Sequence, residues 1–424
     1  MTSRGGSPIW HPFTQHGLQP SMIEIAGAQG AWLDTRDKRR ILDGISSWWV
    51  VTHGHCHPRI LAAIKHKAGR LDQVIFAGFT HEPAETLAGG LIDIAPPGLE
   101  YVFFSDSGST SVEVALKMAL GYWRHIGDKR RRIVAFEHAY HGDTVGGMSL
   151  GARGVFSATY EPLLFDVVRI PFPAPGREQD TLDAFAAVCA AEPVAALIVE
   201  PLILGAGGML IYEARLLREL KRIAAAHGAL LIADEVMTGW GRTGALFASA
   251  KADVAPDILC LAKGITGGSL PLAVTLCTTE IFEAHRSTDR TKTFFHSSSY
   301  TANPIACAAA IANLEIWRTE PVAERIAALE AAHAERLAPF HADGRFANVR
   351  QLGTIAALDL VVSDAGYLAA AGPALMQFFI ERGVLLRPLG NTIYVMPPYC
   401  ITPGELDIVY AAIAEAPGAL ERGA

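Results

Sequence analysis

Lys263 stands where a lysine side chain is able to act as a nucleophile. It lies in the stretch DILCLAKGITGG, in which an apolar run typical of a buried strand leads into glycine-rich chain. Open α/β sheets bind ligands at the carboxyl ends of their strands, and burial there lowers the pKa of a lysine and frees its amine to attack a carbonyl. The position predicts a Schiff-base lysine. Lysines more often end a strand and extend into solvent, so Lys263 alone does not decide between the two.

Asp234 is a carboxylate at a similar position upstream. It ends the apolar run of LLIADEVMTGWGRTG, so Asp234 and Lys263 are able to meet at one edge of a sheet. A buried carboxylate is costly unless it is paired. Pyridoxal phosphate offers a partner, because its ring nitrogen must stay protonated to act as an electron sink. Glu235 is expected to point elsewhere, since neighbouring residues of a strand face opposite ways.

The stretch FFSDSGSTSVEVALKMALGYW predicts an anion site. A strand runs into a turn of small residues, and a helix is expected to begin near Thr110, with Glu113 completing a capping box. Exposed amides at the helix start, with Gly108 permitting close approach, suit a phosphate. Neither GxGxxG nor a P-loop signature is present, which disfavours dinucleotides and nucleoside triphosphates.

Tyr140 follows another apolar run. The stretch HAYHGDTVGGMSLG comes after RIVAF and places Tyr140 and His141 on a loop at a strand end. An aromatic ring there could stack on a flat cofactor. Without the other motifs, Tyr140 would be interpreted as a core residue.

Alternating elements are needed to position these residues. From about residue 58 to 320, helical patterns alternate with apolar runs at 101–104, 132–136, 195–200, 229–235, 258–262 and 273–277. Strands that are apolar on both sides belong in a parallel sheet covered by helices on both faces. One such helix, ARLLRELKRIAAAHG, is expected to stop at Gly228.

The two ends of the chain have a different pattern. Residues 31–49 are typical of a hairpin that turns at Thr35 to Lys38, residues 348–410 mix strands with helices, and the last helix opens with the capping box TPGE. We therefore expect an α/β protein with a large domain at 58–320. A smaller α+β domain is built from both termini, 1–57 and 321–424.

Composition excludes several classes of protein. The 424 residues carry a formal net charge of -7. The chain therefore lacks the excess of positive charge that is typical of nucleic-acid-binding proteins. The clusters RDKRR and DKRRR are typical of solvated turn faces. No stretch is apolar for the roughly 18 residues of a membrane span, and the first residues lack a signal peptide's apolar segment. We expect a cytoplasmic protein without nucleic-acid or membrane partners.

A metal site is also not expected. The six cysteines lie far apart without CxxC spacing, and no second ligand cluster follows the tract THGHCHP at zinc-like spacing. Most of the cysteines are expected to be small buried hydrophobic residues.

Together the motifs resemble those of the class III, fold type I, pyridoxal-phosphate aminotransferases. The resemblance covers essentially the whole chain, with SGS, YHGDT, DEV, GRTG, LAKG and GGSLPLA in the expected order. It implies a mostly parallel seven-stranded sheet between helices and pyridoxal 5'-phosphate as cofactor. It also implies roles for residues: Lys263 as the Schiff-base lysine and proton shuttle, Asp234 as the pyridinium partner, Gly108 and Ser109 on the phosphate, and Tyr140 beside the ring.

The resemblance further implies a homodimer in which each active site is completed by the other subunit. The tract FFHSSSYTANP resembles the segment that reaches a neighbour's phosphate, with Ser298 and Ser299 as candidate ligands. Ser297, where a glycine is usual, is a candidate substrate contact. The alternative is a serine-rich entry to a helix.

Three further stretches narrow the resemblance to the members that convert 8-amino-7-oxononanoate to 7,8-diaminononanoate in biotin biosynthesis. These are IWHPFTQ, DGISSWW and LLRPLGNTIYVMPPY. They imply that Trp48 packs along the apolar chain of this keto acid and that Arg387 binds its carboxylate, for which a planar guanidinium is suited. Phe13 stands where many members have a tyrosine associated with substrate recognition.

The departures at Phe13 and Ser297 leave the amino donor open between S-adenosylmethionine and lysine. A general ω-aminotransferase acting on a diamine or ω-amino acid with pyruvate is the nearest alternative. An aminomutase that keeps the same cofactor, and a regulator that retains the fold for sensing, are two more distant ones.

Overall fold

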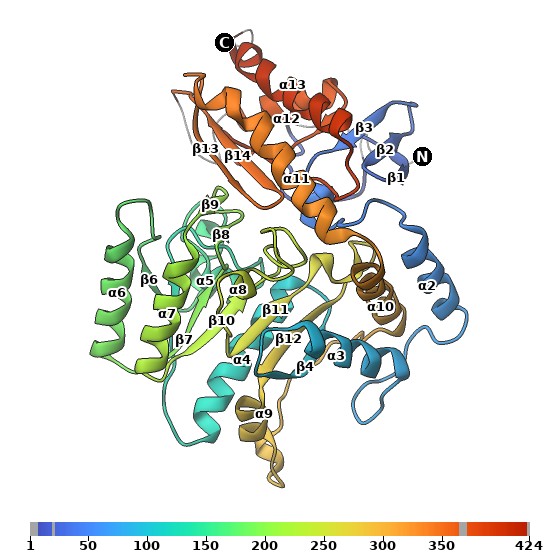
Figure 1. The fold of residues 1–424 in the computed structure, drawn as a ribbon. Coiled ribbons are helices and arrows are strands. Elements are labelled where there is room, and N and C mark those ends of the chain that lie inside the picture. Colours follow the sequence, from blue (N-terminus) through green and yellow to red (C-terminus); the bar gives the residue numbers. More distant parts are fainter. Residues whose placement is uncertain (1–6, 19–21, 364–370, 422–424) are drawn as a thin grey trace.

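The computed structural model describes residues 7–18, 22–363 and 371–421 of the chain. Figure 1 shows a larger region, in which helices surround a sheet, below a smaller region that contains segments from both ends of the sequence. The functional residues predicted above fall in both regions, so their arrangement depends on how the two regions meet.

Within the described residues the largest sheet has seven strands. Their spatial order is β4 (Leu99–Ser105), β12 (Ala273–Thr278), β11 (Ile258–Leu261), β10 (Leu230–Asp234), β7 (Val194–Val199), β5 (Arg132–Phe136) and β6 (Val168–Ile170). All neighbours are parallel except the two pairs made by β12. The predicted apolar runs and the mostly parallel sheet are confirmed. The direction of β12 was not predicted, because an apolar run carries no information on strand direction.

The strands are apolar throughout because both faces of the sheet are covered. On β7, Leu197 and Val199 pack into one core cluster, whereas Ala196 and Ile198 pack into another on the opposite face. The first face is covered by α6 (Glu178–Ala191) and α7 (Ala214–Ala226), and the second by α4 (Gly108–His125). Gly228 follows α7 with φ +68°, which confirms the predicted helix end.

Further helices, 3₁₀ turns and a small ribbon complete the larger region. The helices are α2 (Pro58–Ala68), α3 (Glu82–Ile94), α5 (Val145–Leu150), α8 (Ala248–Lys251), α9 (Thr279–His285) and α10 (Pro304–Thr319). The 3₁₀ turns are η1 (Ala158–Leu163), η2 (Lys263–Thr266) and η3 (Arg290–Lys292), and a small ribbon is formed by β8 (Ile203–Leu204) and β9 (Leu210–Ile211).

The smaller region joins the two ends of the chain in one sheet. Its strands are β1 (Ile25–Gln29), β2 (Trp32–Thr35), β3 (Arg40–Asp43) and β15 (Val384–Leu385), with β15 parallel to β3. A second sheet contains β13 (Phe346–Leu352), β14 (Ile355–Leu360) and β16 (Thr392–Val395). The helical elements here are α1 (Ser46–Trp49), α11 (Val322–Leu337), η4 (Ala338–His341), α12 (Ala371–Glu381) and α13 (Pro403–Glu421).

Two local predictions for this region are confirmed. β2 and β3 form the expected antiparallel hairpin, whose turn includes the bond from Lys38 N to Thr35 O. The hairpin ends at Asp43, so its predicted extent to residue 49 was wrong, because α1 follows. At the start of α13, Thr402 N donates to Glu405 Oε2 over 2.7 Å and Glu405 N donates to Thr402 Oγ1 over 3.3 Å, as in a capping box. The domain boundaries at 57/58 and 320/321 stay a prediction.

The capping box predicted with Glu113 for the helix after the SDSGSTS run was wrong. α4 begins at Gly108, and Ser107 is its cap: Thr110 N donates to Ser107 Oγ, and Ser107 N donates to Thr110 Oγ1. Glu113 instead accepts a hydrogen bond from Gly146 N over 2.7 Å. The run offers several residues that are able to cap a helix, and their types alone do not rank them.

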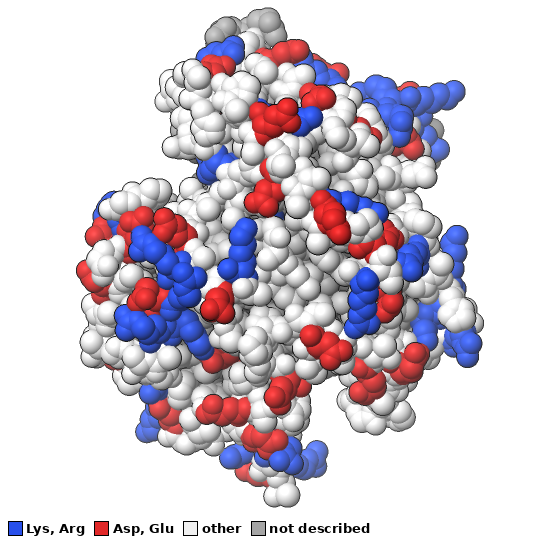
Figure 2. Space-filling view, in the orientation of Figure 1, with Lys and Arg blue, Asp and Glu red and all other residues white. Residues whose placement is uncertain are grey.

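Charges are mixed over the surface shown in Figure 2, and basic side chains gather at the corner where Figure 1 places β1 to β3. Arg36, Arg39 and Arg40 of this hairpin each pair with a nearby carboxylate. Among the helices that the described residues form, none has the length and apolar character needed to cross a membrane.

Candidate active site

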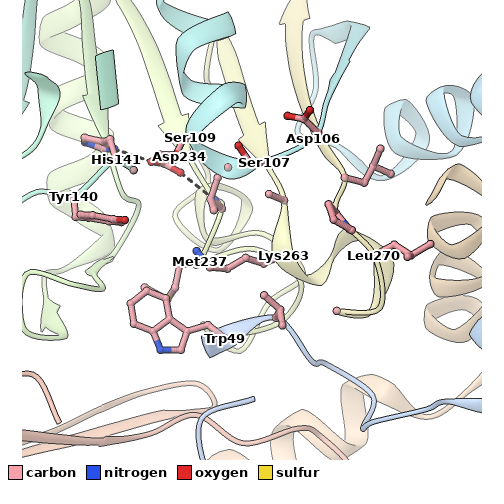
Figure 3. A pocket seen from close by; sticks show the side chains of 18 of the residues that line it. Trp49, Asp106, Ser107, Ser109, Tyr140, His141, Asp234, Met237, Lys263 and Leu270 are labelled. Carbon is pink, nitrogen blue, oxygen red and sulfur yellow. Dashed lines mark hydrogen bonds and ion pairs between the residues drawn. The ribbon is translucent and has the colours of Figure 1, made fainter. Parts of the chain in front are cut away.

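A cavity of about 410 Å³ lies at the carboxyl edge of the large sheet. Its lining includes the five residues expected to bind the cofactor: Lys263, Asp234, Tyr140, Gly108 and Ser109. In Figure 3, the amine of Lys263 points into the cavity, with Asp234 above it, Tyr140 to the left and Trp49 below.

The topology of the sheet brings these residues together. β11, β10, β7 and β5 are consecutive parallel neighbours. Lys263 follows β11, Asp234 ends β10, Glu200 follows β7, and Tyr140 lies after β5. Because the carboxyl ends of parallel strands meet at one edge, four distant segments of the sequence supply side chains to one site.

The amine of Lys263 is held close to aromatic and acidic groups. Its Nζ lies 5.2 Å from the centre of the Trp49 ring. Burial lowers the pKa of Lys263, although the negative charges of Asp234 and Glu200 act in the opposite direction. Lys263 also has φ +47°, a left-handed conformation that is uncommon for a residue other than glycine. The lowered pKa favours the neutral amine, which is the form that attacks a carbonyl carbon.

Asp234 is buried and held by two hydrogen bonds. Its Oδ2 is 2.7 Å from His141 Nδ1, and its Oδ1 accepts from Val236 N over 3.1 Å. The Nε2 atom of His141 is buried and has no hydrogen-bond partner among the described residues. The His141 bond orients the carboxylate, which suits it to hold a protonated ring nitrogen.

Glu235 points away from this site, as predicted. It is fully buried, and it accepts hydrogen bonds from Ala248 N and Ser249 N over 2.6 and 2.7 Å. These bonds satisfy amides at the start of α8. Burial raises the pKa of Glu235 to about 7.

The start of α4 is shaped for a close ligand. A Cβ atom at Gly108 would lie 2.5 Å from Val236 Cγ1, so the packing there requires glycine. Ser109 Oγ accepts from Asp143 N over 3.1 Å, and a Cβ atom at Gly142 would collide with Ser109. Helix amides and the hydroxyl of Ser109 therefore face the cavity at a point where the backbone is open to an anion.

Tyr140 lies on the loop that closes one side of the cavity. Burial raises the pKa of its phenol, and the Asp143 carboxylate raises it further. Its backbone N donates to Glu200 Oε1 over 3.2 Å. The ring is therefore neutral, and its loop is tied to the end of β7.

Glu200 was not predicted from the sequence. It is buried, lines the cavity, and also accepts from Gly205 N over 2.9 Å. Burial raises its pKa to about 7. One signal was present, since Glu200 ends the run AALIVE much as Asp234 ends its own strand.

The predicted substrate residues Phe13, Trp48 and Arg387 come together in space. The Phe13 and Trp48 ring centres are 5.5 Å apart, and Arg387 Nη2 donates to Phe13 O over 3.2 Å. None of the three lines the 410 Å³ cavity, whose lining includes Trp49 instead of Trp48.

A second cavity of about 200 Å³ lies next to the main cavity and includes a neighbour of this cluster in its lining. Its lining includes Tyr140 and Gly142, which also line the main cavity. Phe156, another lining residue, has its ring centre 6.0 Å from that of Phe13. The two cavities therefore share a wall, and the aromatic cluster adjoins the smaller one.

Ser297, Ser298 and Ser299 lie on a loop before α10 and outside the lining of both cavities. Ser298 Oγ donates to Asp106 Oδ2 over 2.8 Å, and Asp106 itself lines the main cavity. Ser297 and Ser299 are exposed. The three serines do not join the site of their own chain.

The histidines of the THGHCHP tract have protein partners. His53 Nε2 is 2.8 Å from Asn313 Oδ1, and His55 Nε2 is 2.8 Å from Asp43 Oδ2. Over residues 7–18, 22–363 and 371–421, no group of three or more histidine, cysteine, aspartate or glutamate side chains is placed to hold a metal ion.

Known proteins match the chain over nearly its whole length. Residues 13–416 match the family model described as aminotransferase class-III. Proteins named adenosylmethionine-8-amino-7-oxononanoate aminotransferase are similar to it. The one from Synechococcus elongatus is 49% identical and covers 96% of this chain and 97% of its own. The one from Mycobacterium leprae is 40% identical, and the match covers 97% of this chain and 95% of the relative.

Solved structures agree with this match. The adenosylmethionine-8-amino-7-oxononanoate aminotransferase of Methanocaldococcus jannaschii superposes with a TM-score of 0.91 at 34% identity, over 96% of this chain and 97% of its own. An amine transaminase from an uncultivated Pseudomonas species, in its PLP-bound form, also superposes with a TM-score of 0.91 at 34% identity. The match covers 97% of this chain and 98% of the transaminase chain.

The cavity fits pyridoxal phosphate. It combines a buried lysine of lowered pKa, an oriented carboxylate for the ring nitrogen, and a helix start where only glycine fits. These groups match the aldehyde, the pyridine ring and the phosphate of the cofactor. The chain belongs to the class-III aminotransferases and is a pyridoxal-phosphate-dependent enzyme.

Proposed function

We propose that the enzyme transfers an amino group to the ketone of 8-amino-7-oxononanoate, giving 7,8-diaminononanoate in biotin biosynthesis, with S-adenosylmethionine as donor. The relatives of this name match the chain over nearly its full length. The observation that carries the proposal is the cluster of Arg387, Trp48 and Phe13 beside the smaller cavity.

The cluster combines the two properties that this keto acid requires. The rings of Trp48 and Phe13 offer apolar surface to its hydrocarbon chain. The guanidinium of Arg387 donates to Phe13 O and to Met376 Sδ, and a guanidinium has five N–H donors in all. Donors therefore remain for the carboxylate at the far end of the substrate.

The cofactor, when bound, supplies an electron sink that stabilises negative charge at the carbon next to the reacting nitrogen. In this proposal Lys263 would hold the cofactor, and its amine would then remove the proton from that carbon of the donor and, in the second half-reaction, deliver a proton to the corresponding carbon of the keto acid. Asp234, oriented by His141, keeps the ring nitrogen protonated. Gly108 and Ser109 bind the phosphate, and Tyr140 covers the ring and excludes water.

A half-reaction tests the donor. Purified, cofactor-loaded enzyme is mixed separately with S-adenosylmethionine and with lysine, and the change in cofactor absorbance is followed. A change with S-adenosylmethionine alone supports the proposal. A change with lysine alone makes lysine the donor, and Phe13→Tyr and Ser297→Gly are then the first variants to make.

A full reaction tests the acceptor. If 8-amino-7-oxononanoate is not aminated with either donor while pyruvate and a simple diamine react, the enzyme is a general ω-aminotransferase. Turnover without any second keto acid would instead indicate an aminomutase. The matched control is Lys263→Ala, which should be inactive with every pair of substrates.

The proposal includes a homodimer in which Ser298 and Ser299 bind the phosphate of the partner subunit. Their position outside the cavities of their own chain supports this. Large exposed apolar side chains lie on the same loop, with Phe295 and Tyr300 at 69% and 62% exposure. A dimer would bury such a surface.

Mixing two inactive variants tests the shared site. Lys263→Ala and the double variant Ser298→Ala, Ser299→Ala are unfolded, refolded together with cofactor, and assayed. If the serines act across the interface, each hybrid dimer contains one intact site and activity returns. If they act within their own chain, no activity returns. If they do not bind the phosphate at all, the double serine variant is already active before mixing.

Two further proposals complete the description. The division into domains 1–57 with 321–424, and 58–320, is tested by limited proteolysis with mass spectrometry of the fragments. Cytoplasmic location stays a prediction of the sequence, which cell fractionation tests.

A further inference from the structure

The segment α1 forms one turn of left-handed helix made entirely of residues other than glycine. Ser46, Ser47, Trp48 and Trp49 have φ values of 53°, 45°, 71° and 74°. Trp49 N donates to Ile45 O over 2.8 Å, and Val50 N donates to Ser46 O over 2.9 Å. The left-handed conformation costs roughly 1–2 kcal/mol per residue and is usually adopted by single residues. Four in succession therefore require strong support from their surroundings.

This turn directs its two tryptophans to different parts of the active site. Trp49 is 5% exposed, lies at the floor of the main cavity (Figure 3), and its Nε1 donates to Tyr394 OH over 3.0 Å. Trp48 is 38% exposed and contacts Phe13 and Arg387. One strained turn thus places both the indole beside Lys263 and the indole beside Arg387.

Asp43 supports the turn from within the protein. Its side chain is fully buried. Oδ1 accepts from Ile45 N and Ser47 N over 3.2 and 2.9 Å, and Oδ2 accepts from Ser47 Oγ over 2.8 Å. His55 Nε2 lies 2.8 Å from the same Oδ2. Burying a carboxylate is costly unless it is paired and hydrogen-bonded, and here its bonds go to the strained turn and to His55.

We infer that Asp43 is a positioning residue, which holds the left-handed turn and through it sets the places of Trp48 and Trp49 in the active site. Successive residues of a left-handed turn rotate in the opposite sense to those of an ordinary helix. A relaxed right-handed turn of the same four residues would therefore misplace both indoles. The substrate part of the inference, through Trp48, rests on the proposed function.

Asp43→Asn and Asp43→Ala test the support. Asparagine keeps an oxygen for the two amides and offers N–H donors to Ser47 Oγ and to a neutral His55, so this variant should stay close to the parent. Alanine removes every bond. It should raise the KM for the keto acid about tenfold or more, because misplacement by about 1 Å is able to cost up to 100-fold. Asp34→Asn, at an exposed carboxylate of β2, is the control.

Tryptophan fluorescence gives a readout that does not depend on turnover. Trp49 lies beside the cofactor cavity, so cofactor titrated into the apoprotein should quench its emission, and Trp49→Phe identifies that share of the signal. Asp43→Ala should lose most of this share, and Asp43→Asn should keep it. A folded Asp43→Ala variant with the parent's KM and quenching would overturn the inference.

A pair of substitutions at Ser47 tests whether the left-handed turn positions the two tryptophans, even if Asp43→Ala does not fold. Ser47→Gly and Ser47→Val both remove the hydroxyl, but only glycine adopts positive φ without strain. The glycine variant should keep the parent's melting temperature within a few degrees and most of the quenching. The valine variant should lose quenching and have a KM about tenfold or more above that of the glycine variant. Equal behaviour of the two variants would contradict a role for the left-handed turn.

The outcomes separate this inference from the proposed function. If the parent does not aminate 8-amino-7-oxononanoate, the proposed function fails. The quenching of Trp49 in the Asp43 variants still tests the positioning role of Asp43, and the difference between Ser47→Gly and Ser47→Val still tests the role of the left-handed turn.

Discussion

The guanidinium carbon of Arg387 lies 5.1 Å from the centre of the Trp48 indole ring. The two residues come from opposite ends of the chain, and the parallel pairing of β15 with β3 brings those ends together. A guanidinium on an aromatic face keeps its N–H groups at its edge, where they are able to bind a carboxylate in bidentate fashion. The contact therefore places a carboxylate-binding group next to apolar surface.

Arg387→Ala should weaken binding of the carboxylate-bearing keto acid. Loss of a charge-assisted hydrogen-bonded pair costs about 1.5–3 kcal/mol, so the KM for the keto acid should rise by roughly 10- to 150-fold. The donor half-reaction should change little if the donor does not use this residue. Arg387→Lys keeps the positive charge but loses the planar guanidinium. Its KM for the keto acid should lie between the values of the parent and of Arg387→Ala. Steady-state kinetics with an unchanged KM in both variants would remove Arg387 from the site.

Lys263→Ala should abolish covalent attachment of the cofactor without loss of the fold. Borohydride reduction followed by mass spectrometry should find cofactor on the parent and none on the variant. Turnover should fall by at least about 100-fold, the lower range of the contribution of a positioned proton-transfer group. Circular dichroism is the control for folding. Turnover near that of the parent would make the assignment of Lys263 wrong.

The capture of the cofactor by the apoprotein should depend on pH in a predictable way. Burial lowers the pKa of Lys263 from its ordinary value of 10.5. The neutral amine, which is the reactive form, therefore accumulates as pH rises through this lowered pKa. The rate of capture should level off below pH 10.5, whereas that of N-acetyl-lysine continues to rise. Stopped-flow absorbance measures both, and identical profiles would contradict the prediction.

Asp234→Asn should leave the cofactor attached but inefficient. The amide carries no charge, so the ring nitrogen is no longer held in its protonated form and the electron sink is weakened. Removing a preorganised electrostatic group of this kind costs about 100-fold or more in turnover. Asp183→Asn, an exposed carboxylate on α6, is the control. Equal activity of the two variants would show that Asp234 does not contact the ring nitrogen.

Glu200→Gln should change how stability depends on pH. The folded pKa of Glu200 is about 7 against an ordinary 4.5, so the folded protein holds this proton more tightly than the unfolded chain. The associated stability is present below pH 4.5 and is lost as pH rises through 7, with a total on the order of 3 kcal/mol. Urea unfolding of the apoprotein between pH 5 and 8 should show a flatter profile in the variant. If the free energy of unfolding depends on pH in the same way in the parent and in Glu200→Gln, the raised pKa of Glu200 is contradicted.

Local patterns were sufficient for most strands of the large sheet and for several residues that line the main cavity. Apolar runs predicted six of the seven strands of the large sheet, all except the short β6. Polar residues at the carboxyl ends of these runs, such as Asp234 and Lys263, were recognised because a charge next to a buried run is unusual. Glu200 has the same signal and was missed, since no motif drew attention to it. The cap of α4 was assigned incorrectly because several serines and a threonine compete within a few residues.

The division between sequence and structure follows the range of the forces involved. Strand and helix patterns express burial and local hydrogen bonding, which depend on neighbouring residues, so composition and spacing were enough to predict them. The antiparallel direction of β12 and the contact of Arg387 with Trp48 depend on pairing between distant segments. The left-handed turn at Ser46–Trp49 is opposed by local conformational preference and is held by the buried carboxylate of Asp43. Only the tertiary structure decided it, because the interactions that outweigh the local cost exist only after folding.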